Sequence, residues 1–109
     1  MNPTPDSLEV KKSIDEIEAE MKRIGYWSAD PLPEEAYDFR EAFAMDTMAF
    51  SQWLQFILIP RVHQIIAEGG EFPANSMVGA QAMREFDGDA DAAHLVSLLG
   101  EFDRLFTGK

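Results

Sequence analysis

The most hydrophobic element of the chain reads FSQWLQFILIPRVHQIIAE over residues 50–68. At about 100° per residue one side of this run carries a continuous apolar stripe, which predicts a helix. The stripe consists of Phe50, Trp53, Leu54, Ile57, Leu58 and Ile65, and a second apolar side carries Ile59, Val62 and Ile66. A helix that is apolar on two sides belongs at the centre of a helical bundle.

Pro60 and Arg61 interrupt this pattern. Pro60 lacks a backbone N–H, so we expect it to leave the carbonyl of Phe56 without its normal partner and to bend the helix. A uniform helical projection places Arg61 inside the apolar stripe. Its guanidinium then has three alternatives: to reach solvent from the end of the bundle, to pair with a carboxylate such as Glu101 or Asp103, or to face a cleft that binds an anion or a partner. Pairing is the alternative that we favour.

The flanking segments predict three further helices. Apolar residues recur at spacings of four and three over residues 6–24, and Gly25 follows as a stop signal. A weaker helix opens at residues 73–76 and ends near Phe86, and a leucine-rich stripe predicts a last helix over residues 89–106.

The connection between the first and the central helix is irregular. Residues 26–33 form a proline-rich connector whose aromatic pair, Tyr26 and Trp27, folds back over the core. Residues 34–45 show no clean period, which indicates irregular structure or one short turn of helix. No β period occurs in the sequence. We therefore predict an all-α fold in a single domain over residues 1–109: an irregular four-helix bundle, mostly antiparallel, with a kinked hydrophobic central helix.

Composition excludes several classes of function. The chain has 109 residues and a formal charge of −11, from 20 acidic and 9 scattered basic residues. Direct binding to a nucleic-acid backbone needs clustered Lys and Arg, so we expect no such surface, and a solvated acidic face or a protein partner fits better. The chain has no Cys, which excludes disulfides and thiolate metal sites. We find no export signal or membrane span and expect a cytoplasmic protein, with self-association left open.

No catalytic, metal or cofactor site can be assembled from these residues. The run DGDAD at residues 87–91 imitates the start of a calcium loop, but Ala92 and Leu98 replace two required residues, so we expect helix capping. Asp91 and His94 have the spacing of a di-iron motif, whose second copy is missing because Pro60 stands three residues before His63.

Residues 43–61 read FAMDTMAFSQWLQFILIPR and resemble the signature D-T-M-x-F-x-Q-W-L-Q-[FW]-x-x-I-P-R of the YqcC-like family of small bacterial proteins. The order of the remaining elements is compatible over essentially the whole chain. The resemblance implies a compact helical bundle without an assigned activity. Members are often labelled with tRNA pseudouridine synthase C, which implies an association with that enzyme. Asp46 is not carried over as a catalytic residue, because the chain is too short, too helical and too acidic for a pseudouridine synthase.

The signature residues form the candidate partner or ligand site: Asp46, Thr47, Trp53, Gln55, Pro60 and Arg61. Asp46 or Thr47 is positioned to cap the central helix, and Trp53 is expected in the core. Gln55 falls on the second apolar side; whether it is buried or lines a cleft is left open, and if it is buried its amide must bond to backbone, for which the segment over residues 34–45 is a candidate.

Two functions remain open. The first is a non-enzymatic interaction or accessory module, with a tRNA-modifying enzyme as the suspected partner. The second is a ligand-binding protein or enzyme that uses a pocket around Asp46, Trp53, Gln55 and Arg61. The first is favoured because the sequence supplies no catalytic set.

Overall fold

The first helix, α1 (Ser7–Arg23), is amphipathic and buries one complete stripe. Its apolar residues Val10, Ile14, Ile17 and Met21 are all 0% exposed. The helix ends at Arg23, and the turn that follows contains Gly25, whose φ of 81° is a left-handed conformation that a glycine adopts without steric cost. The computed structural model describes residues 7–72 and 76–107, and within them the predicted first helix is confirmed.

The central helix runs through three segments: α2 (Phe50–Trp53), the π-helical turn η3 (Leu54–Leu58) and α3 (Ile59–Glu68). In the π turn the N–H of Ile59 donates to the carbonyl of Leu54, five residues back. The turn immediately precedes Pro60, which has no N–H to donate. The irregularity that the sequence predicts at Pro60 therefore takes the form of one wider turn inside a continuing helix.

The π turn changes which residues face the core. One extra residue in the turn shifts the buried face, so that Leu54 is followed by Leu58, Ile59 and Val62, which are at most 9% exposed. Arg61 is exposed. The prediction that Arg61 lies inside the apolar stripe is wrong, because it assumed one uniform helical period across Pro60.

The last part of the chain contains α4 (Val78–Glu85), the 3₁₀ turn η4 (Ala90–Ala92) and α5 (Ala93–Thr107). The predicted opening of the fourth element lies partly at residues 73–75, outside the described residues, and the observed helix begins at Val78. Asp89 caps η4, since its side chain accepts the N–H of Asp91 at 3.1 Å. The predicted capping role of this acidic run is confirmed.

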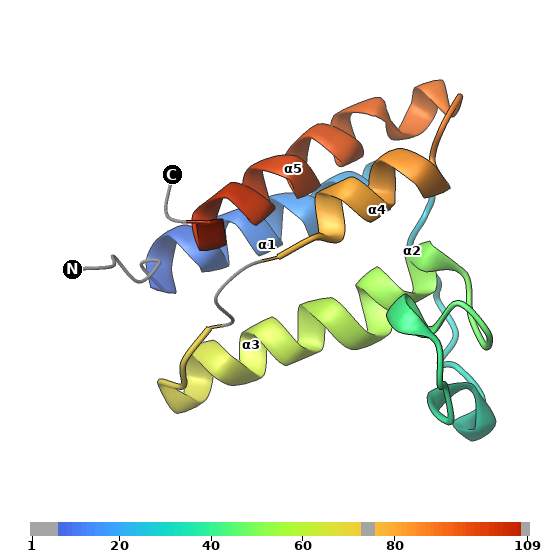
Figure 1. Ribbon diagram of the computed structural model, residues 1–109, viewed down its shortest axis with the longest axis horizontal. Helices are drawn as coiled ribbons and strands as arrows, with labels where there is room; N and C mark the ends of the chain where they lie inside the picture. Colours follow the sequence, from blue (N-terminus) through green and yellow to red (C-terminus); the bar gives the residue numbers. More distant parts are fainter. Residues whose placement is uncertain (1–6, 73–75, 108–109) are drawn as a thin grey trace.

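The helices are arranged mainly antiparallel (Figure 1). α5 packs antiparallel on α1, the central helix also runs antiparallel to α1, and α4 lies antiparallel against α5. The predicted all-α bundle is confirmed for the described residues. None of the described helices is long and apolar enough to cross a membrane.

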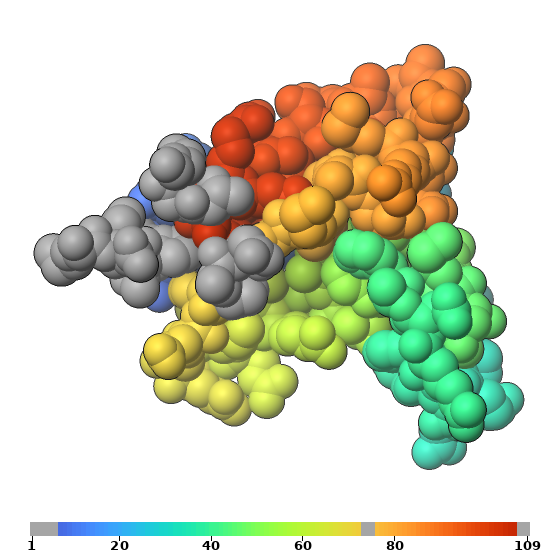
Figure 2. Space-filling model, in the orientation of Figure 1, coloured from blue at the N-terminus to red at the C-terminus, as the bar shows by residue number. Residues whose placement is uncertain are grey.

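The segment before the central helix contains two short 3₁₀ turns, η1 (Glu34–Tyr37) and η2 (Ala42–Ala44), as predicted for an irregular region. It lies at one end of the bundle and its surface meets that of α4 (Figure 2). At this contact the amide of Gln81 donates to the sulfur of Met45 at 3.6 Å.

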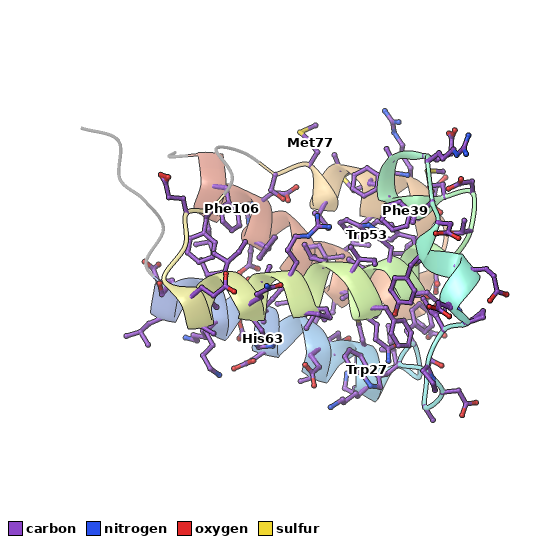
Figure 3. All side chains as sticks on the ribbon, turned by 90° about the horizontal axis from the view of Figure 1, so that it is seen from below. Trp27, Phe39, Trp53, His63, Met77 and Phe106 are labelled. Carbon is purple, nitrogen blue, oxygen red and sulfur yellow. The ribbon has the colours of Figure 1, made fainter. Side chains whose placement is uncertain are left out.

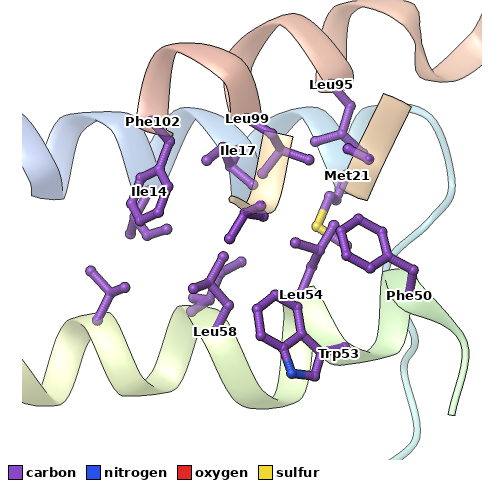
Figure 4. Packing of buried hydrophobic residues seen from close by; sticks show 14 of the residues in the cluster. Ile14, Ile17, Met21, Phe50, Trp53, Leu54, Leu58, Leu95, Leu99 and Phe102 are labelled. Carbon is purple, nitrogen blue, oxygen red and sulfur yellow. The ribbon is translucent and has the colours of Figure 1, made fainter. Parts of the chain in front are cut away.

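The two sides of the central helix have different neighbours (Figure 3). Trp53, Phe106 and Met77 lie on one side of it, and His63 and Trp27 lie on the other. Between α1, α5 and the central helix the core is largely aliphatic, with Ile14, Ile17, Leu95 and Leu99 facing Leu54 and Leu58 (Figure 4).

Aromatic side chains close the core at both ends. At one end Phe50 contacts Phe43, Trp53 and Phe86, with ring centroids 5.6–5.9 Å apart. At the other end Phe106 contacts Phe72 and Phe102 at 5.8 and 4.8 Å. Four of these ring pairs are edge-on and Phe50–Trp53 is stacked, and such pairs add stabilisation beyond the apolar area that they bury.

Gly79 sets the distance between α4 and α5. A Cβ at Gly79 would lie 2.8 Å from the Cα of Gly100 and 2.9 Å from the Oδ2 of Asp103, closer than real Cβ atoms approach. A Cβ at Gly100 would meet nothing within 4 Å. The sequence shows Gly79 only as a weak helix former, whereas the fold uses its missing side chain for close helix packing.

We predict opposite outcomes for two Gly-to-Ala substitutions at this contact. Gly79→Ala should lower the free energy of unfolding by about 1–3 kcal/mol, because the two helices must separate. Gly100→Ala should leave stability unchanged or raise it by up to about 1 kcal/mol, because Ala favours the helix. Urea unfolding of both variants measures the difference, and equal effects would contradict the assigned contact.

Candidate functional site

A pocket of about 200 Å³ lies between the central helix, α4 and α5. One wall is the side of the central helix that carries Trp53. Phe106 and Met77 lie on the same side of this helix (Figure 3). The pocket is lined by Trp53, Leu58, Arg61, Val62, Ile65, Phe72, Ser76, Met77, Val78, Phe102 and Phe106. Nine of these eleven side chains are apolar, and none of them is acidic.

Arg61 lines this pocket from α3 and is exposed. Within the described part of the chain its guanidinium forms no hydrogen bond or ion pair. The pairing with Glu101 or Asp103 that we favoured from the sequence is not observed. Glu101 lines a different hollow, together with Glu9 and Glu16. The position of Arg61 matches the third alternative, a cation at the wall of a cleft.

Asp103 has a structural partner that the sequence did not indicate. Its Oδ1 accepts hydrogen bonds from the Ser76 hydroxyl at 2.5 Å and the Val78 N–H at 3.0 Å, and its Oδ2 accepts the Gly79 N–H at 2.7 Å. A carboxylate from α5 therefore satisfies free N–H groups at the start of α4, where the helix dipole also favours negative charge. This contact fixes two residues of the pocket wall, Ser76 and Val78.

Trp53 is only 9% exposed, as expected for a core residue, and it also lines the pocket. Its ring is held edge-on by Phe43 at 5.0 Å and stacks with Phe50 at 5.9 Å. The indole is therefore a rigid part of the wall.

Asp46 organises the irregular segment. Its carboxylate accepts the backbone N–H groups of Arg40 at 3.0 Å and Glu41 at 3.3 Å. The bond from Arg40, followed by that from Glu41, holds the pKa of Asp46 below its ordinary value, because both bonds favour the charged carboxylate. The predicted cap on the central helix is wrong, since the side-chain oxygen of Gln52 accepts the Ala49 N–H there at 2.8 Å.

Thr47 contributes to the same segment. Its hydroxyl donates to the carbonyl of Ala36 at 2.6 Å, so it does not cap the central helix either. The hydrogen bonds of Asp46 and Thr47 reach back to Ala36, Arg40 and Glu41. They therefore span Phe43 and Ala44, whose φ values are 57° and 52°. The left-handed conformation costs roughly 1–2 kcal/mol for each residue with a Cβ. The hydrogen bonds of the Asp-Thr pair offset that cost and keep Phe43 against Trp53.

Gln55 is buried, which the sequence left open, and its amide bonds to backbone, as the sequence requires of a buried amide there. Its Oε1 accepts the Ser28 N–H and its Nε2 donates to the Ser28 carbonyl, both at 2.8 Å. The partner lies in the connector over residues 26–33, so the predicted partner segment over residues 34–45 is wrong. The irregular connector needs this partner because it has no neighbouring strand or helix to satisfy Ser28.

The structure thus divides the candidate site residues into two groups and leaves Pro60 outside both. Trp53 and Arg61 share the pocket, whereas Asp46, Thr47 and Gln55 hold irregular backbone, and Pro60 is exposed outside the pocket lining. Sequence reasoning missed the remaining walls, above all Phe72, Met77 and Phe106. Their apolar character alone gave no signal, because these walls meet only through the packing of α3, α4 and α5. In the described segments no group of three or more His, Asp or Glu side chains is placed to hold a metal ion.

We predict that Gln55→Leu lowers the free energy of unfolding by about 1–3 kcal/mol, because Ser28 loses both partners of its backbone groups. Gln64→Leu is the matched control, since Gln64 is exposed and, among the described residues, its side chain bonds only to exposed Glu68 at 3.2 Å. The control should change stability by less than about 0.5 kcal/mol. Equal effects of the two substitutions in urea unfolding would show that the Gln55 contact is unimportant.

We predict that Asp46 contributes to acid sensitivity. Because its folded pKa is lowered, its contribution to stability is complete above the unfolded pKa of about 3.9 and is lost as the pH falls through the folded value. Asp46→Asn should therefore lose less stability than the parent chain between pH 7 and pH 3. Asp38→Asn, at an exposed carboxylate of the same loop, should lose as much as the parent chain. Urea unfolding at both pH values measures these differences, and parallel losses in all three proteins would refute the role of Asp46.

Known proteins share this sequence pattern and this architecture. The model of the DUF446 family, described as tRNA pseudouridine synthase C, matches residues 9–105. The solution structure of YqcC from Escherichia coli superposes with a TM-score of 0.81 at 26% identity, over 92% of this chain and 86% of that one.

Three curated relatives are also similar. An uncharacterised protein of Haemophilus influenzae is 28% identical over 82 residues, covering 72% of this chain and 77% of the relative. The uncharacterised protein YqcC of E. coli is 32% identical over 57 residues, which span 52% of each protein. A tRNA pseudouridine synthase C of Pectobacterium carotovorum is 34% identical over 58 residues, which span 53% of this chain but only 15% of that protein. The chain belongs to the DUF446 family of YqcC-like proteins.

Proposed function

We propose that the chain is a non-enzymatic interaction module that serves as an accessory to a tRNA pseudouridine synthase. The observation that carries the proposal is the Pectobacterium relative, which bears the name of that enzyme and resembles this chain over only 15% of its length. The other 85% of that protein leaves room for a catalytic domain. The same module occurs in relatives of which it forms half or more, in Haemophilus and E. coli. A module found both joined to an enzyme and apart from it is typical of a binding partner.

The contacts of the signature residues support a non-enzymatic role. Both carboxylate oxygens of Asp46 accept backbone N–H groups, and both polar atoms of the Gln55 amide bond to Ser28. A general base or nucleophile needs a free, correctly placed polar atom facing its substrate. The polar atoms of these two side chains are instead hydrogen-bonded to the protein's own backbone.

The charge of the chain supports a protein partner over direct contact with tRNA. A formal charge of −11 repels a phosphate backbone, so the tRNA would be bound by the synthase and not by this module. The alternative, a four-residue ligand or catalytic site, has less support because Asp46 and Gln55 do not line the pocket that holds Trp53 and Arg61.

We predict that the purified chain binds the tRNA pseudouridine synthase C of its own host and forms no pseudouridine when it is incubated with tRNA alone. Size-exclusion chromatography and calorimetry at about 0.15 M salt measure the association, and modification of host tRNA measures activity. An unrelated acidic helical protein of similar charge serves as the control. Pseudouridine formation by the chain alone, or no complex at micromolar concentration, would overturn the proposal.

A further inference from the structure

We propose that the Trp53–Arg61 pocket, defined by the eleven lining residues given above, is the anchor site for the partner protein. It receives one large apolar side chain of the partner, and a carboxylate next to that side chain in the partner pairs with Arg61. The inference rests on the proposed function, because it names the surface through which the interaction module binds.

The size of the pocket favours a protein side chain over a free small molecule. Sites for drug-sized ligands and cofactors enclose about 300–1,000 Å³. The volume here is about 200 Å³, which suits a single aromatic or aliphatic side chain. Protein interfaces gain most of their binding energy from a few such side chains that enter well-packed pockets.

The rim provides the apolar surface that an anchor pocket needs around it. Met77, which lines the pocket, is 63% exposed and so presents apolar surface to a partner beside the cavity. Its flexible thioether adapts to partner surfaces of different shape. Trp53 and the Asp103-bound start of α4 supply the rigid walls, so a partner side chain enters a preformed cavity and orders little on binding.

The charge at the pocket indicates which polar group of the partner binds beside the apolar side chain. Arg61 has no hydrogen bond or ion pair with any described residue, and no acidic side chain lines the pocket. Other surface hollows do carry carboxylates, such as Glu9 and Glu16 of α1 or Asp87 and Asp89 in the turn after α4. A guanidinium beside apolar walls recognises a carboxylate through paired hydrogen bonds. The matching group is an apolar side chain with a neighbouring Asp or Glu.

Two pairs of exposed substitutions test the surface with the host synthase. Arg61→Glu and Met77→Ala should each weaken binding at least tenfold, because they remove the charge partner and the apolar rim. Arg84→Glu and Met83→Ala change the same residue types on α4 outside the pocket and should stay within twofold. Circular dichroism confirms that all four variants are folded. If the parent chain binds and all four variants bind as it does, the partner docks elsewhere and the anchor site is wrong.

A second measurement separates this inference from the proposed function. The probes are 3-phenylpropionate and its neutral amide, titrated into the ¹⁵N-labelled chain even if no synthase binds. We expect millimolar binding of the carboxylate with shifts at residues 58–65 and 76–78, weaker binding of the amide, and loss of the difference in Arg61→Glu. Absence of any shift, or equal binding of both probes, would overturn the predicted chemistry.

Two other outcomes would show that the occupant is not a partner protein. Micromolar binding of the carboxylate would indicate a free small-molecule ligand. Self-association that Arg61→Glu abolishes would indicate a second copy of the chain.

Discussion

The missing backbone donor of Pro60 is the constraint on which the arrangement of the central helix depends. A proline in a helix interior removes one N–H and crowds the preceding turn. The chain keeps its helix by widening the turn before Pro60, so that Ile59 bonds to the carbonyl of Leu54. The wider turn rotates the rest of the helix relative to the core. Val62 becomes buried and Arg61 moves out to the pocket wall.

A second constraint comes from the irregular backbone that leads into this helix. Segments without helix or strand partners must satisfy their N–H and carbonyl groups in another way. Here three polar side chains do so: Gln55 at Ser28, Asp46 at Arg40 and Glu41, and Thr47 at Ala36. All three belong to the family signature. The signature is therefore largely a description of how the fold holds its loops, and this explains why polar residues that suggest a reactive site are not placed together.

The parts of the structure that sequence predicts well are those that depend on one local period. The stripe of α1, the stop at Gly25 and the stripe of α5 follow from apolar spacing and were all predicted. Spacing also placed Gln55 on an apolar side and required a backbone partner for its amide if buried, but it left the burial itself open. Predictions failed where the answer depended on another element: the role of Asp46, the partner of Asp103, and the close approach of Gly79 to Gly100. At Arg61 even the local projection failed, because one added residue in a turn moves every later side chain by a full position.

The pocket itself follows from how α4 is held. Gly79 and Asp103 draw α4 tightly onto α5, at a separation that any side chain at Gly79 would prevent. Between the central helix, α5 and the start of α4 the side chains leave a pocket of about 200 Å³, to which α4 contributes Val78. Packed interiors rarely keep such space, since larger side chains would fill it and bury more apolar surface. The lining already includes four large aromatic side chains, Trp53, Phe72, Phe102 and Phe106, and the pocket adjoins the exposed Met77 and Arg61, which has no hydrogen bond or ion pair with a described residue. The polar signature residues hold the loops, whereas the apolar walls and Arg61, which has no partner among the described residues, are the features from which we propose that a partner side chain binds in this pocket.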